Sequence, residues 1–212
     1  MESRDRVTGE FLVFTIMKQK IIVLFLLLVN ISGSYAQKND LDSALTLMTN
    51  ASIKGDSKTL LKYTSPRLIK AMGGNSNALK LFKEAYDSMS HTGISIDSVV
   101  NYTKGPIYNI GQLHYLQIPQ LVIMNTKEDG KKLIGQALLL GLNETGKGQW
   151  TFLDYKSLSQ EQVDILLPEF KGVVNLVNRP ETKPILADNA EVDNIVNEVL
   201  KALYKMLNQI NP

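Results

Sequence analysis

The small number of histidines and the absence of cysteine limit the reactions that this chain could catalyse. His91 and His114 are its two histidines, and cysteine is absent. Without cysteine there is no thiolate nucleophile, no thiolate metal ligand and no disulfide. His91 falls at the end of a predicted helix, where the helix dipole favours a cation. His114 lies in a predicted strand and could face an interior, with a role as a hydrogen-bonded wall residue as the alternative.

No sequence motif specifies a reaction, a metal or a cofactor. The carboxylates are not clustered at the spacing of metal ligands, and no serine occupies a Gly-x-Ser-x-Gly turn. Gly73-Gly74 lacks the spacing of a phosphate-binding loop and is interpreted as a turn. We therefore predict no metal site and no cofactor.

Aromatic side chains on the predicted strands form the best candidate for a binding site. Since these strands should be neighbours, the side chains could line a cavity for a small apolar or glycan ligand, and core packing is the alternative. The predicted ligand-binding residues are Tyr102, Tyr108, His114, Tyr115, Trp150 and Phe152.

Three helices are predicted ahead of these strands. Apolar residues recur at helical spacing over 40–53, with Asp40 placed to cap the first turn. Asp56 can cap a second helix that Pro66 interrupts or restarts. A third helix fits residues 75–89.

Beyond Gly93 the apolar pattern changes to the alternation typical of strands. The predicted strands cover residues 94–102, 107–126, 132–143 and 149–155. Pro119 predicts an edge, a bulge or a bend in the second of them. Residues 132–143 are apolar on both faces, so the sheet needs two covers, and the three helices supply one unless the sheet curls.

Three helices followed by long antiparallel strands, closing in Gln149-Trp150-Thr151-Phe152-Leu153-Asp154, resemble the NTF2-like, or cystatin-like, cone fold over about residues 40–155. The resemblance implies an α+β fold with N-terminal helices packed on a curved antiparallel sheet and a cavity at the wide end. It also implies that, in an enzyme of this type, a histidine and an aspartate would transfer protons in the cavity. The matching pair here would be His114 and Asp154.

The C-terminal part adds two further helices. Ser159 and Gln162 form a predicted capping box ahead of a short helix that ends at Pro168. The predicted NTF2-like domain covers residues 37–170, a connector covers 171–187, and an amphipathic helix covers 188–212. The apolar stripe of this last helix predicts either a lid on its own domain or an interface of a homodimer.

The N-terminal part has the pattern of a secretory signal peptide. Lys18 and Lys20 precede the apolar run Ile21–Val29, and small residues lead to a cleavage point after Ala36. A membrane span needs about 20 apolar residues, which is longer than this run. We predict a leader over 1–36, with Met17 as the true start.

Export and composition together predict the class of protein. The mature chain would be periplasmic or secreted from a bacterium and would not be an integral membrane protein. The full chain has a net charge of +2, and removal of the leader leaves 23 − 4 = 19 basic and 21 − 3 = 18 acidic residues, near +1. Without a clustered basic face, this charge gives no reason to predict nucleic acid as a partner. We expect a non-catalytic domain that binds a small ligand or an envelope protein. The alternatives are a small-molecule enzyme using the His114 and Asp154 pair, and a structural homo-oligomer.

Overall fold

The computed structural model describes residues 40–144, 148–156, 158–174, 176 and 183–210. The predicted leader over 1–36, with the Ala36 cleavage point, lies outside these residues, as does part of the predicted connector. The elements discussed below belong to the compact unit Asp42–Pro212.

The predicted helices are confirmed, and the structure decides whether Pro66 interrupts a helix or begins one. Residues 40–54 are helical, and Pro66 starts a new helix, because its missing N–H and fixed φ suit a first turn. The Asp56 carboxylate accepts hydrogen bonds from the Thr59 backbone N–H, at 3.1 Å, and from the Thr59 hydroxyl, at 2.7 Å. The next helices along the chain are α2 (Ser57–Tyr63), α3 (Pro66–Ala71) and α4 (Asn75–His91).

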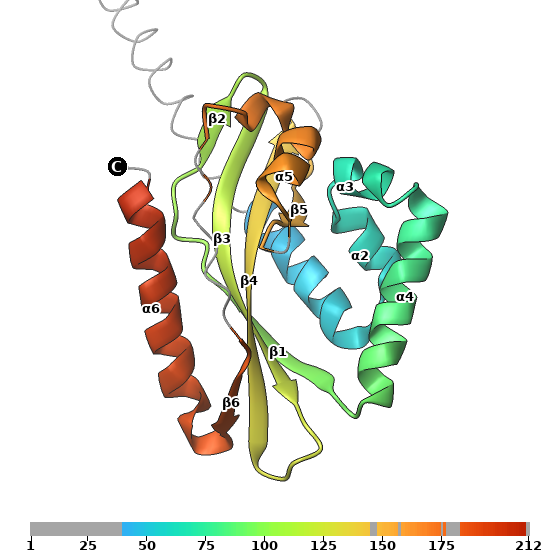
Figure 1. Ribbon diagram of the computed structural model, residues 1–212, viewed down its shortest axis with the longest axis vertical. Coiled ribbons are helices and arrows are strands. Elements are labelled where there is room, and N and C mark those ends of the chain that lie inside the picture. The colour runs from blue at the N-terminus through green and yellow to red at the C-terminus, as the bar shows by residue number, and fades with distance from the viewer. Residues whose placement is uncertain (1–39, 145–147, 157, 175, 177–182, 211–212) are drawn as a thin grey trace, which may run out of the picture. The chain divides into compact units, whose positions relative to one another are not determined.

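A six-stranded antiparallel sheet forms the centre of the unit (Figure 1). Its two long strands, β3 and β4, lie in the middle. Strands β1 and β2 share the outer edge of β3, and β5 and β6 share the outer edge of β4. The sheet is curved and does not close. The strands are β1 (Ser95–Asn101), β2 (Tyr108–Ile110), β3 (Leu113–Asn125), β4 (Lys131–Glu144), β5 (Thr151–Asp154) and β6 (Ile185–Asp188).

Pro119 lies within β3 at the junction between its two outer partners. Strand β2 pairs with β3 as far as Tyr115, and β1 pairs with it from Gln120 onward. The Pro119 carbonyl accepts a hydrogen bond from the Tyr102 backbone N–H at 2.9 Å. Since the N and O of one residue in an antiparallel strand point to the same edge, the Pro119 nitrogen faces this junction, and its missing N–H breaks no pairing with β4.

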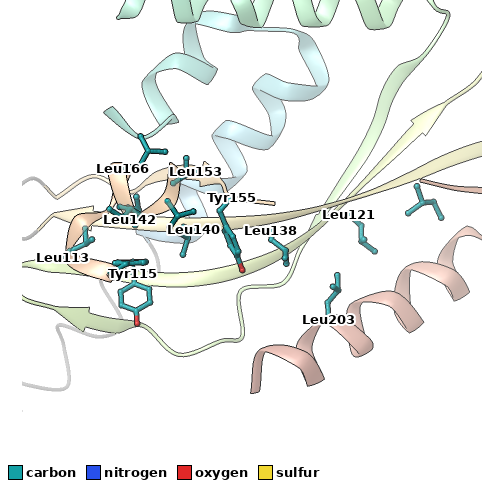
Figure 2. Close-up of a cluster of buried hydrophobic side chains, with 14 of the residues drawn as sticks. Leu113, Tyr115, Leu121, Leu138, Leu140, Leu142, Leu153, Tyr155, Leu166 and Leu203 are labelled. Atoms are coloured by element: carbon teal, nitrogen blue, oxygen red, sulfur yellow. The ribbon is translucent and has the colours of Figure 1, made fainter. Parts of the chain in front are cut away.

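One face of the sheet is covered by C-terminal elements. The elements are α5 (Gln160–Leu166), the 3-10 helix η1 (Pro168–Phe170) and α6 (Val192–Ile210), which packs against β3 and β4. The predicted capping box is present, because Ser159 accepts from the Gln162 backbone N–H and Gln162 accepts from that of Ser159. Figure 2 shows Leu203 of α6 on the side of the sheet from which Leu121 projects.

The other face carries the N-terminal helices (Figure 1). Strand alternation places Leu116, Ile118 and Gln120 on this face, and all three are buried. Asn101 links the sheet to the first helix, since it donates to the Thr49 hydroxyl at 3.0 Å and accepts from Gln120 at 2.7 Å. The α+β fold with N-terminal helices on a curved sheet and a C-terminal helix is therefore observed, and α5, η1 and α6 supply the second cover.

Within the described ranges, none of the helices combines the length and apolar character needed to cross a bilayer.

Candidate functional site

The predicted aromatic site is divided between different parts of the fold. Tyr108 and Tyr115 stack at a centroid distance of 5.3 Å, and Tyr115 contacts Phe170 of η1 at 4.7 Å, within the core beneath the C-terminal elements. Tyr102 packs against Tyr204 of α6, with ring centroids 4.6 Å apart. These three tyrosines therefore attach η1 and α6 to the sheet.

The two remaining aromatic residues are core residues near β5. Trp150 is 1% exposed and Phe152 is 3% exposed. Phe152 pairs with Gly141 of β4, and strand alternation places both on the face that carries the N-terminal helices. Neither of the two cavities described below is lined by a member of the predicted aromatic set.

The register of the sheet separates His114 from Asp154. His114 pairs with Asn143, whereas Asp154 pairs with Leu139, and β4 lies between their strands. At about 3.4 Å per residue and about 4.8 Å per strand, their Cα atoms are about 17 Å apart. The Asp154 carboxylate accepts a hydrogen bond from the Lys156 backbone N–H at 2.9 Å. Direct proton transfer needs the donor and acceptor atoms to be about 3 Å apart. The fold therefore does not bring His114 and Asp154 together.

A cavity of about 180 Å³ lies at one end of the sheet, where β3 and β5 begin and β4 ends. Leu113 and Leu142 supply apolar side chains to its wall. Its polar lining comes from Lys62, Ser65, Arg67, Glu144, Gln149 and Thr151. We call this the Ser65 cavity. A second, more open depression between α2, α3 and the start of α4 shares Lys62 and Pro66 with it.

Ser65 is held at the cavity by its backbone. Thr64 forms a parallel bridge with Phe152, and the Ser65 N–H donates to the Phe152 carbonyl at 2.8 Å. Ser65 is the N-cap of α3, yet its side chain makes no capping hydrogen bond. The residue is 1% exposed. Ser65 therefore lines the cavity wall without capping α3 through its side chain.

Arg67 joins three elements beside the cavity. Its Nη1 donates to Glu169 Oε2 at 2.8 Å and to the Leu166 carbonyl at 3.1 Å. Its Nη2 lies 2.7 Å from Glu169 Oε1 and 3.6 Å from Glu144 Oε1. The hydrogen bond to Glu169 raises the pKa of the Arg67 guanidinium although burial opposes this. These contacts of Arg67 fix α3 to α5, η1 and the end of β4.

The ion pair between Arg67 and Glu169 makes the stability of the fold depend on pH. Burial raises the pKa of Glu169, but hydrogen bonds from Arg67 and from backbone, together with the Arg67 charge, outweigh it and leave the pKa lowered. A lowered native pKa stabilises the fold above the unfolded pKa of about 4.3, and this contribution is lost as the pH falls through the native pKa.

We expect Glu169→Gln to have a lower free energy of unfolding than the wild type at neutral pH. Most of this difference between the two proteins should disappear in acid. The free energy of unfolding, measured in urea at about pH 7 and about pH 3, tests this. Glu84→Gln is the control, because Glu84 forms an exposed pair with Lys80 at 3.7 Å. A Glu169→Gln difference that stays constant with pH would contradict the assignment.

Sequence reasoning did not identify this cavity. Ser65-Pro66 carries a local signal, a helix start, which predicts the position of Ser65 but not what surrounds it. Arg67 and Glu169 are 102 positions apart in the chain, and no local pattern relates them. His91 lies at the end of α4, as predicted, and its Nδ1 lies 2.6 Å from the Asp87 carbonyl.

Comparison with known proteins gives no match to a protein-family model, to a curated protein or to a solved structure. Over the part of the chain that the structure describes, no three His, Asp or Glu side chains gather as metal ligands would.

Proposed function

We propose that this protein is an exported, non-catalytic domain that binds a small molecule in the Ser65 cavity. Export rests on the signal-peptide pattern before Gln37 and places the protein in the periplasm or outside the cell. The fold separates His114 from Asp154, the pair on which the alternative of an enzyme depends.

The observation that carries this proposal is the Ser65 hydroxyl. Ser65 is buried at the cavity wall and its side chain does not cap α3, so a polar group of a ligand in the cavity would give this hydroxyl a hydrogen-bond partner. The walls around it combine two leucines with several polar side chains. Ligand sites have this composition, in which apolar surface provides contact and a few polar groups fix orientation.

Native mass spectrometry of the protein recovered from its own cell envelope tests the proposal. We expect a mass that begins at Gln37, with a reproducible small-molecule adduct. The adduct should disappear in Ser65→Ala and remain in Ser90→Ala, because Ser90 is an exposed residue of α4 outside the cavity lining.

Each of the other results would contradict part of the proposal. A wild-type mass without an adduct would overturn binding of a small molecule. An adduct that Ser65→Ala retains would place the ligand elsewhere. A mass that still includes residues before Gln37 would overturn processing of the leader.

A further inference from the structure

We infer that the ligand of the Ser65 cavity is a neutral, polyhydroxylated molecule about the size of a single sugar ring. This inference rests on the proposed function. It deepens that function by naming the chemical class of the ligand from the charges, the hydrogen-bonding groups and the volume of the cavity.

The charges around the cavity disfavour an ionic ligand. Both terminal nitrogens of Arg67 are engaged by Glu169, at 2.8 Å and 2.7 Å, and Glu144 lies 3.6 Å from Nη2. An anionic ligand would compete with these two carboxylates and would be repelled by Glu144. A cationic ligand would be repelled by Arg67 and Lys62, which both line the cavity. Like charges at close range cost several kcal/mol, so a neutral ligand is favoured.

The polar groups suit hydroxyls, because each hydroxyl of a ligand both donates and accepts. Gln149 already donates through Nε2 to the Lys62 carbonyl at 3.1 Å, so its Oε1 is the atom offered as an acceptor. The Thr151 hydroxyl lies 3.4 Å from the Leu142 carbonyl, a long contact, and the Ser65 hydroxyl can donate or accept. A ring that carries several hydroxyls can meet acceptors and donors together, whereas a carboxylate only accepts.

The size and the apolar wall narrow the class further. The cavity has a volume of about 180 Å³. Cavities for drug-sized ligands start at about 300 Å³. Leu113 and Leu142 offer an apolar surface to the C–H face of a ring. One sugar ring fits this description, and a longer glycan would extend into solvent.

A matched series of sugars tests the charge argument on one ring shape. The ¹⁵N-labelled protein is titrated with D-glucose or D-galactose as neutral probes, with D-glucuronate or D-galacturonate as anions, and with D-glucosamine as a cation. We expect shifts of the Ser65, Arg67 and Thr151 amide signals with a neutral sugar. Its affinity should exceed that of the matching anion and cation by about tenfold or more.

Glu144→Gln separates charge selection from a structural effect. Removing this carboxylate should raise the ratio of the uronate affinity to the neutral-sugar affinity severalfold. A merely structural role of Glu144 would leave this ratio unchanged. Ser65→Ala should weaken the neutral sugar, and Ser90→Ala should not.

The remaining outcomes overturn the inference in distinguishable ways. Preference for the uronate or the amino sugar at the same amides would overturn the neutral class and leave the proposed cavity function standing. No binding of any probe at these amides, together with an adduct in the native mass, would overturn the sugar class alone. No binding and no adduct would overturn both.

Discussion

Replacing Trp150 with alanine is expected to lower the free energy of unfolding by about 3–5 kcal/mol. Trp150 is among the largest fully buried side chains, at 1% exposure. Its loss removes a large apolar contact area and leaves a cavity that the surrounding core fills only in part. A tryptophan on the wall of a ligand cavity would have little effect on stability and a direct effect on binding.

Urea unfolding followed by far-UV circular dichroism measures the Trp150→Ala effect. Fluorescence is unsuitable, because Trp150 is the single tryptophan of the chain. A lower midpoint with an unchanged m-value identifies a change in stability. Ile165→Ala is the control, since Ile165 is 71% exposed and its truncation should cost less than about 0.5 kcal/mol. A fully stable Trp150→Ala protein would restore the prediction of Trp150 as a ligand contact.

The second large effect is expected for Leu203→Asp in α6. Leu203 is 6% exposed, and α6 packs against β3 and β4. The substitution removes a buried leucine, which costs about 2–5 kcal/mol, and a carboxylate buried there would add a further cost. We expect α6 to detach from the sheet, so that the apolar side chains beneath it become exposed.

Two measurements check the Leu203→Asp prediction. Urea unfolding should show the lost stability, and limited proteolysis should cut the variant within α6 earlier than the wild type. Asn197→Asp is the matched control, because it adds the same charge at an exposed position of the same helix. If the wild type is a dimer and Leu203→Asp is a monomer of unchanged stability, α6 is instead an interface between copies.

Local signals account for the elements that the sequence predicted correctly. The helix over residues 40–54, the Asp56 cap, the start of α3 at Pro66 and the capping box of α5 each depend on residues within a few positions of one another. Apolar periodicity predicted the long strands for the same reason. The resemblance to the NTF2-like fold stays a prediction, although the α+β class that it implied is observed.

Residue type alone did not predict which side chains meet. All six residues of the predicted ligand-binding set are aromatic or histidine, and such residues serve equally well in a core and in a cavity wall. The sequence could not assign the cover of the second face either, since the stripe of α6 suits its own sheet as well as another subunit. In the fold, Leu203 and Val196 are buried in the core of the same chain.

By itself, the sequence determined where the chain forms helices and strands, that it lacks thiol chemistry, and that its fold class is α+β. These properties depend on composition and on neighbours in the chain. Only the tertiary structure decided that His114 and Asp154 are apart, that Trp150 is core, and that Ser65 and Arg67 share a cavity with Glu144. Strand register and the packing of distant segments set these distances, and many residues acting together determine both.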